Sequence, residues 1–361
     1  MRIAIITGAY EPFMNGVTTS IVNTEKELKR RGWEVLIISP RDFEINQTAP
    51  ALKWKESSAC PGYNLVRLVK PKPKNIQKLF KMLDAFAPET IHIATECTLG
   101  AMAIQYSRKR RFAFTTAYHT RFPEIGAQIV REKFFIPGEL SKPCGQLYMR
   151  LFHQRSSAVM VALPSLAEEL ASQGFKNLKI WSRGIDHTVF CQEGETVDLG
   201  PRPVFIHYGR LSLDKGFTEF CALKLPGTMV AVGEGPVADV GYWKKEFPHV
   251  RFMGRADGEM RGTYLRSADV MIFLSKTDTF GLTTIEANSC GTPVVAIDHF
   301  PHNDLIENGL NGWAIDDIKK AAALAAAFTP EMRDRCAQKA QEYTWERATD
   351  EFIANLVPIK G

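Results

Sequence analysis

Short apolar runs alternate with amphipathic segments along the whole chain. Residues 2–7, 33–39 and 91–95 are apolar runs typical of buried strands. Between such runs lie segments with helical spacing, most clearly 75–86, where apolar residues recur at 76, 79, 80, 83 and 86. Strands that alternate with helices predict an α/β fold with parallel sheets.

The same alternation restarts after a linker. Residues 192–203 are rich in acidic residues, glycine and proline, and apolar runs then follow at 204–208, 228–232, 250–253, 269–274 and 293–297. Because 361 residues exceed the usual size of a single core, we expect two Rossmann-like domains, at 1–195 and 196–343. The first lacks a G-x-G-x-x-G sequence, which argues against a dinucleotide.

Composition limits the setting in which the protein works. The chain is 45% hydrophobic and 24% charged, as is ordinary for a soluble globular protein, and no stretch approaches the ~18 apolar residues of a membrane span. Its seven cysteines include no C-x-x-C pair, which indicates reduced thiols in a cytoplasmic compartment. Any membrane contact is therefore expected to be peripheral.

Two acids flank the start of a predicted helix after the run 269–274. Asp278 and Glu286 lie about two helical turns apart, so both carboxylates can face one cleft. Phe280 and Gly281 stand between them, and the helix begins near Leu282, where backbone amides can approach a ligand. The alternative is that Asp278 or the next residue caps the helix and Glu286 is a solvated surface acid.

Four further residues stand near predicted strand ends. Arg210 and Lys215 follow the run 204–208 and have the charges of a diphosphate clamp. His119 follows a strand in the first half, where an open α/β sheet presents ligands, although a lone histidine there can be structural. Gly16 lies where a loop turns into a helix and can equally be a turn glycine.

Taken together, these segments resemble the retaining glycosyltransferases of family 4. The resemblance rests on D-T-F-G-L-T-T-I-E at 278–286 with C-G-T-P-V-V at 290–295, on G-R-L-S-L-D-K-G at 209–216, and on H-T at 119–120. It covers essentially the whole chain. At the first acid position, where most of the family has Glu, this sequence has Asp278. The substitution resembles a subgroup that uses GDP-mannose or related donors to build membrane glycolipids.

The resemblance implies a GT-B fold, in which two Rossmann-like domains face a central cleft and a helix at 344–361 crosses back to the first domain. It also implies transfer of a hexose from a nucleotide-diphosphate sugar, either GDP-mannose or a UDP-hexose, to a membrane lipid or glycolipid acceptor.

The family assigns roles to the candidate residues. The resemblance implies that Arg210 and Lys215 bind the donor phosphates with the amides of Gly281 and Leu282, and that Glu286 binds the ribose. Asp278 and His119 contact the donor sugar, while Gly16 and Phe280 complete the donor site.

The sequence provides for no metal cofactor. It contains no D-x-D, the paired aspartates that hold a metal on the leaving diphosphate, so we expect fixed positive charges to act instead. One departure from the family has no evident consequence: the segment 298–303, which includes His302 and Asn303, lacks the usual glycines. Two other functions stay open, namely a GT-B nucleotide-sugar epimerase and a non-catalytic sugar-nucleotide-binding partner in envelope assembly.

The two halves differ strongly in charge. Residues 1–160 contain 24 Lys and Arg against 13 Asp and Glu, a net charge of +11, which leaves −6 for the remainder. The basic residues concentrate at 70–81, 108–111 and 131–155, with Leu79, Phe80 and residues 134–136 as apolar anchors. This pattern predicts peripheral binding to an anionic membrane, on the inner face of the cytoplasmic membrane. Recognised nucleic-acid motifs are absent, and a basic face can simply be solvated.

Overall fold

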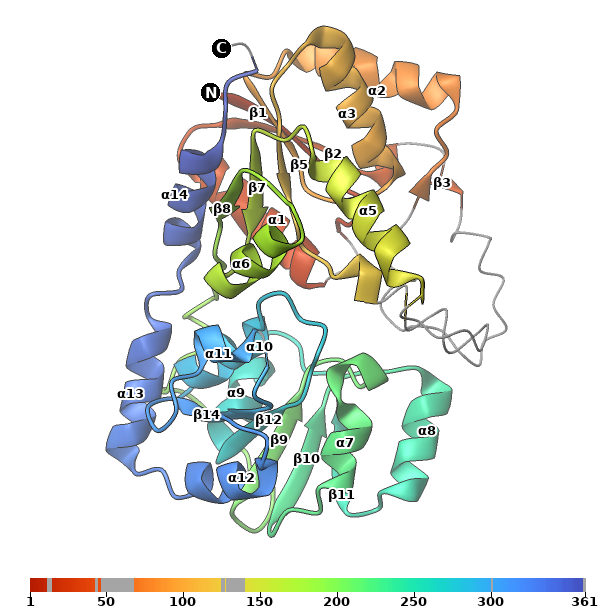
Figure 1. Ribbon diagram of the computed structural model, residues 1–361. Coiled ribbons are helices and arrows are strands. Elements are labelled where there is room, and N and C mark those ends of the chain that lie inside the picture. Colours follow the sequence, from red (N-terminus) through yellow and green to blue (C-terminus); the bar gives the residue numbers. More distant parts are fainter. Residues whose placement is uncertain are drawn as a thin grey trace. The chain divides into compact units, whose positions relative to one another are not determined.

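The computed structural model describes residues 1–11, 15–42, 45–46, 68–124, 127, 140–299 and 301–359 (Figure 1). The chain divides into two compact units, Met1–Ser182 with Trp345–Gly361, and Arg183–Thr344. Each unit contains a six-stranded sheet in which every pair of neighbouring strands is parallel. The structure confirms the predicted fold class.

The first unit has the strand order β2-β1-β5-β6-β7-β8. A two-residue antiparallel pair, β3 and β4, stands apart from this sheet. Its elements in chain order are β1 (Arg2–Ile6), α1 (Gly16–Arg30), β2 (Glu34–Ile38), β3 (Ile45–Asn46), β4 (Leu68–Val69), α2 (Pro73–Phe86), β5 (Thr90–Ile93), α3 (Thr98–Arg110), β6 (Thr115–Ala117), α5 (Lys142–His153), β7 (Ala158–Val161), α6 (Pro164–Ser172), β8 (Leu178–Ile180) and α14 (Trp345–Asn355).

The first sheet is buried on both faces, which explains its continuous apolar strands. Successive residues of a strand point to opposite faces, so Ala4 and Ile6 pack on one side while Ile3 and Ile5 pack on the other. Helix α14 covers the second side, where the ring centroid of Phe352 lies 4.8 Å from that of Trp181. The last helix of the chain thus completes the core of the first unit.

The second unit has the strand order β11-β10-β9-β12-β13-β14. Its elements are β9 (Val204–Tyr208), η4 (Leu213–Lys215), α7 (Phe217–Ala222), β10 (Thr228–Val232), α8 (Val237–Glu246), β11 (Val250–Gly254), α9 (Met260–Ser267), β12 (Val270–Phe273), α10 (Leu282–Ser289), β13 (Val294–Ala296), α11 (His302–Leu305), β14 (Gly312–Ala314), α12 (Ile318–Ala326) and α13 (Pro330–Ala340).

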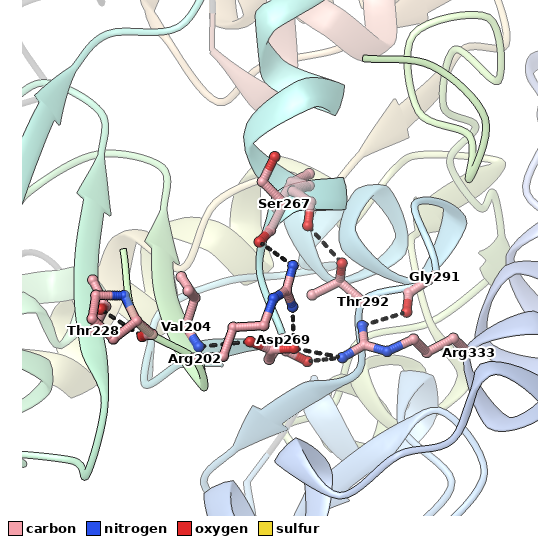
Figure 2. A network of polar contacts seen from close by, with 10 residues as sticks. Arg202, Val204, Thr228, Ser267, Asp269, Gly291, Thr292 and Arg333 are labelled. Atoms are coloured by element: carbon pink, nitrogen blue, oxygen red, sulfur yellow. Dashed lines mark hydrogen bonds and ion pairs between the residues drawn. The ribbon is translucent and has the colours of Figure 1, made fainter. Parts of the chain in front are cut away.

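A polar network ties the amino ends of the second sheet to α13 (Figure 2). Asp269, just before β12, accepts a bond from the Val204 amide at 2.7 Å and pairs with the guanidinium of Arg202. Arg333 of α13 donates to the Asp269 carboxylate at 3.2 Å and to the Gly291 carbonyl at 3.2 Å. The buried carboxylate of Asp269 is thereby satisfied, and it joins two strands and a helix at the edge opposite the carboxyl ends.

The boundary between the units lies at 182/183, earlier than the predicted 195/196. The Ile185 amide donates to the Tyr343 carbonyl at 3.1 Å, and the Ser289 hydroxyl donates to the Phe190 carbonyl at 2.6 Å. These bonds fasten residues 183–190 to the second unit before the linker begins. On the other side, the Ser182 amide and hydroxyl both donate to Glu351 of α14, which belongs to the first unit.

Helix α6 begins at Pro164, with Leu163 in the capping position and no side-chain cap. A proline at the first helical position has no amide that needs a partner, which suits it to this place. Strand β4 covers only Leu68 and Val69. Across the described helices, none has the length and apolar character that crossing a bilayer requires.

Candidate functional site

The second sheet has its topological switch at β9, which lies between β10 and β12. In open parallel sheets, ligands bind outside the carboxyl ends of the strands at such a switch. Arg210 and Lys215 follow β9, and Asp278 follows β12. The fold therefore brings three of the predicted residues to the position where this architecture places a ligand.

Lys215 and Asp278 form an ion pair across the switch. The Nζ of Lys215 lies 2.6 and 2.7 Å from the two carboxylate oxygens of Asp278. The next residue, Gly216, has a φ of +66°, and a Cβ there would lie 2.6 Å from the Leu274 carbonyl oxygen. Only glycine allows this close approach, so Gly216 brings the turn that carries Lys215 against the end of β12.

The environment of Asp278 favours its charged form. Burial alone raises the pKa of a carboxyl group, but the ammonium of Lys215, together with a hydrogen bond from Ser275, outweighs burial and holds the pKa of Asp278 below its ordinary value. Asp278 is therefore an anion at neutral pH. The pair presents one cation and one anion, each on a side chain that is about one-fifth exposed.

Arg210 reaches solvent more freely than Lys215. Its guanidinium lies 3.0 Å from Asp214, and its side chain is 40% exposed. The Arg210 carbonyl accepts a 3.3 Å bond from Nε2 of His207, a buried histidine of β9 whose pKa burial lowers to about 4. His207 is thus neutral at physiological pH and fixes the backbone of the loop that carries Arg210.

Glycines bring the ends of β9 and β10 together beside this loop. Gly233 has a φ of +150°, and a Cβ there would lie 1.7 Å from the Gly209 carbonyl oxygen. No side chain fits in that space, so the two loops touch through their backbones. Glycine at position 233 is therefore required for the close packing of these two loops at the carboxyl edge of the sheet.

The helix after Asp278 begins at Leu282, as predicted. Gly281, with a φ of +93°, occupies the capping position of α10, and no side chain caps the helix. The alternative in which Asp278 caps the helix is therefore excluded. The first amides of α10 give the amino end of this helix a partial positive charge of roughly +0.5, which favours the binding of an anion. Leu282 is half-buried, whereas the Phe280 ring is buried and packs 5.9 Å from the Tyr343 ring.

Glu286 occupies an environment opposite to that of Asp278. Burial raises the pKa of Glu286 to about 7, and the nearby charge of Arg261 only moderates the rise. The Glu286 charge also contributes, after burial, to the raised pKa of Tyr208 at the end of β9. Glu286 is half-buried, so its carboxyl group is not that of a freely exposed surface acid.

Ser275 and His302 lie close enough to the pair to affect the pKa of Asp278, and the sequence assigned no role to them or to Asn303. Nε2 of His302 bonds to the Ser275 carbonyl at 2.9 Å, and burial lowers the pKa of this histidine. Asn303 donates to the side chain of Asp298 at 2.8 Å. His207 could have been noticed as a polar residue within a fully apolar strand, but no pattern marks His302.

The remaining two candidates lie in the first unit. Gly16 is the exposed first residue of α1, and the preceding Asn15 caps this helix by accepting from the Thr18 amide at 2.9 Å. His119 follows β6 and is buried, with its ring 5.4 Å from that of Trp181. Both follow carboxyl ends of their sheet. Within the described ranges, no group of three or more His, Cys, Asp or Glu side chains is arranged to hold a metal.

Comparison with known proteins agrees with this architecture. The profile described as Glycosyltransferase Family 4 matches residues 14–189, and the profile described as Glycosyl transferases group 1 matches residues 228–348. Together they span most of both units.

Two curated relatives are similar over most of their length. A GDP-mannose-dependent alpha-mannosyltransferase of Corynebacterium glutamicum is 26% identical over 99% of this chain and 89% of its own. An alpha-monoglucosyldiacylglycerol synthase of Acholeplasma laidlawii is 25% identical over 86% of this chain and 84% of its own. Among solved structures, a sucrose-phosphate synthase of Thermosynechococcus elongatus aligns with a TM-score of 0.74 at 18% identity, covering 98% and 97% of the two chains.

Proposed function

Because this chain belongs to the family 4 glycosyltransferases and has the GT-B fold, we propose that it transfers a hexose, with retention of configuration, to a membrane lipid or glycolipid. The donor is a nucleotide-diphosphate sugar, either GDP-mannose or a UDP-hexose. The observation that carries this proposal is the Lys215–Asp278 pair at the switch point of the second sheet, beside Arg210 and the start of α10.

In the proposed reaction, the bond between the anomeric carbon and the diphosphate oxygen breaks while negative charge accumulates on the leaving phosphates. Arg210 supplies a fork of donors, Lys215 a compact cation, and the first amides of α10 a fixed dipole at that charge. Groups already in place need no reorganisation during the reaction, which makes this kind of stabilisation effective. We propose that these protein charges suffice without a metal.

The donor hydroxyls require acceptors, and the two acids supply them. Asp278, held in its anionic form by Lys215, accepts from the hexose. Glu286 accepts from the ribose, which requires that it lose the proton that burial favours. His119 and Gly16 are assigned to the donor on the family resemblance alone.

The configuration of the anomeric carbon is retained if the diphosphate leaves and the acceptor attacks on the same face of the sugar. The acceptor hydroxyl oxygen then forms the new bond to the anomeric carbon, and its proton passes to an oxygen of the departing phosphate. No covalent sugar–protein intermediate is needed in this sequence of events. The names of the two relatives support a lipid acceptor and a GDP-mannose donor.

Product analysis tests the proposal. The purified protein is first screened by thermal shift with GDP-mannose, UDP-glucose, UDP-glucuronate and UDP-galactose, since a ligand at ~100 times its dissociation constant stabilises by about 2.7 kcal/mol. The stabilising donor, radiolabelled in the sugar, is then incubated with detergent-dispersed diacylglycerol and phospholipids. Label in the lipid phase supports the proposal. An epimerised nucleotide sugar, or no product with any donor, contradicts it.

A further inference from the structure

Helix α5 (Lys142–His153) is apolar on two sides. One side is buried: Met149 and Phe152 belong to the interior of the first unit. Phe152 packs against Gly100 of α3 so closely that a Cβ on that glycine would lie 2.9 Å from the ring. A helix on the surface of a globular protein normally has one apolar stripe of this kind and a polar opposite face.

The opposite face of α5 is apolar as well. Leu147, Tyr148 and Leu151 expose 48%, 48% and 59% of their surface, and Leu140, just before the helix, exposes 70%. Residues three and four positions apart share a helix face, so Leu147, Tyr148 and Leu151 form one stripe, and Leu140 precedes the same helix. They are four of the twelve strongly exposed large hydrophobic residues in the described part of the chain, so exposure is concentrated here.

The charged residues of α5 and of the segment that follows it up to residue 167 are all basic. Residues 141–167 contain no Asp or Glu, whereas Lys142, Arg150 and Arg155 lie on or next to α5, and both arginines are exposed. An apolar stripe with a basic border matches an anionic lipid surface, in which acyl chains receive the apolar groups and phosphates receive the cations. A helix with leucines along one stripe and arginines beside it has the composition of helices that lie at a membrane interface.

We infer that the stripe formed by Leu147, Tyr148 and Leu151, with Leu140 before it, is the surface that docks the protein on an anionic bilayer. Tyr148 suits the boundary between lipid and water because its ring is amphipathic. Its hydroxyl donates to the Glu96 carbonyl at 3.0 Å, which fixes the ring. The inference rests on the proposed function, because a lipid acceptor requires such a surface.

The anchors expected from the sequence differ from this stripe. Leu79 is fully buried in the core, and Phe80 is half-buried with its ring 5.0 Å from that of Tyr106. Neither is available to a bilayer. Residues 134–136 lie outside the described residues.

Vesicle cosedimentation tests the inference with the full chain. The double variant Leu147→Ser/Leu151→Ser is compared with wild type. Both are mixed with vesicles of phosphatidylcholine that contain roughly one-third phosphatidylglycerol. Val237→Ser/Leu324→Ser is the matched control, since these apolar residues of the second unit are 91% and 41% exposed. Leu147→Met/Leu151→Met preserves the apolar surface. Thermal unfolding establishes that each variant is folded.

We expect the Ser double variant to bind at least about tenfold more weakly, and the control and Met variants to bind like wild type. Arg150→Gln and Arg155→Gln should each weaken binding about fivefold at low salt. Equal binding by the Ser variant, or no wild-type binding at low salt, overturns the inference. Transfer to detergent-dispersed lipid is measured in parallel, so a protein that transfers hexose but fails to bind vesicles refutes the docking surface alone.

Discussion

Lys215 and Asp278, 63 positions apart, form a bidentate ion pair at 2.6 and 2.7 Å where β9 and β12 end. The pair fixes the position of the lysine ammonium before any donor arrives. An ammonium on a free four-carbon chain loses rotational freedom when it binds a phosphate, whereas this one is already ordered. The pair thus prepares a cation for the leaving diphosphate and an anion for the donor hydroxyls.

Asp278→Asn should reduce kcat/KM for the donor by about 5- to 150-fold, because a charge-assisted hydrogen bond contributes about 1–3 kcal/mol. Asp278→Glu keeps the charge and should recover part of the loss. The measurement is steady-state transfer with varied donor. Wild-type kinetics in the Asn variant would remove Asp278 from the donor site.

The same pair should be insensitive to pH across the physiological range. Since the folded pKa of Asp278 is lowered, the stability that the pair contributes is present above the ordinary carboxyl pKa of about 3.9 and is lost as the pH falls through the folded pKa. Urea unfolding of wild type and Asp278→Asn should therefore differ by a constant amount from pH 8 to pH 5. A difference that shrinks within that interval contradicts the assignment.

Glu286 should make donor binding depend on pH near neutrality. Its pKa in the empty protein is raised to about 7, so the carboxylate that accepts from ribose hydroxyls forms as the pH rises through that value. Donor affinity by calorimetry should increase from pH 6 to pH 8. Glu286→Gln should bind about 1–3 kcal/mol more weakly at pH 8 and show a flat profile.

Stability provides the opposite readout for the same residue. A carboxyl group with a raised folded pKa costs no stability below its unfolded pKa of about 4.3, and the folded state loses stability as the pH rises through the folded value. Glu286→Gln should therefore unfold at a higher temperature than wild type at pH 8 and at a similar temperature at pH 4.5. A variant that is less stable at pH 8 refutes a desolvated, functional Glu286.

The network around Asp269 should matter for stability and not for catalysis. Asp269→Ala removes the acceptor of the Val204 amide and the partner of Arg202 and Arg333, and a buried donor left without an acceptor costs about 1–3 kcal/mol. Asp334→Ala, on the same helix as Arg333, loses only an exposed bond to Gln192 and should change unfolding little. Because Asp269 lies at the amino edge, the donor KM of folded Asp269→Ala should match wild type.

Chelation tests the metal-free proposal. Activity should persist in excess EDTA, with no gain on adding Mg²⁺ or Mn²⁺, because Arg210 and Lys215 are proposed to supply the charge that a metal provides elsewhere. A variant lacking both cations, dialysed against EDTA, serves as the inactive reference. Loss of wild-type activity in EDTA with rescue by either ion contradicts the proposal.

The order of strands and helices could be predicted because each element carries its own periodic signal. The strand β12 and the helix α10 lie where the apolar run and the Gly281 turn placed them. The sequence could predict the residues of the Lys215–Asp278 pair only as members of two separate segments. That Lys215 meets Asp278 depends on the sheet order, which brings β9 beside β12, and sheet order is not written in any local pattern.

Other features depend on long-range contacts that a linear reading does not contain. The boundary at 182/183 follows from the bond between Ile185 and Tyr343, at opposite ends of the second unit. The periodicity of 75–86 identified a helix but suggested Leu79 as an exposed anchor, although that residue belongs to the buried stripe. On α5 both stripes are apolar, so only the structure separates the face that packs from the face that is exposed.

The central claim is that fixed cations of the second unit stabilise the leaving diphosphate, and one measurement tests it most directly. Turnover is determined for Arg210→Ala, Lys215→Ala and Lys276→Ala, the last an exposed lysine beside the site. The account predicts losses of about 100-fold or more for the first two, from about 3 kcal/mol of lost charge stabilisation, and near-normal turnover for Lys276→Ala. Near-normal turnover in folded Arg210→Ala and Lys215→Ala contradicts the account.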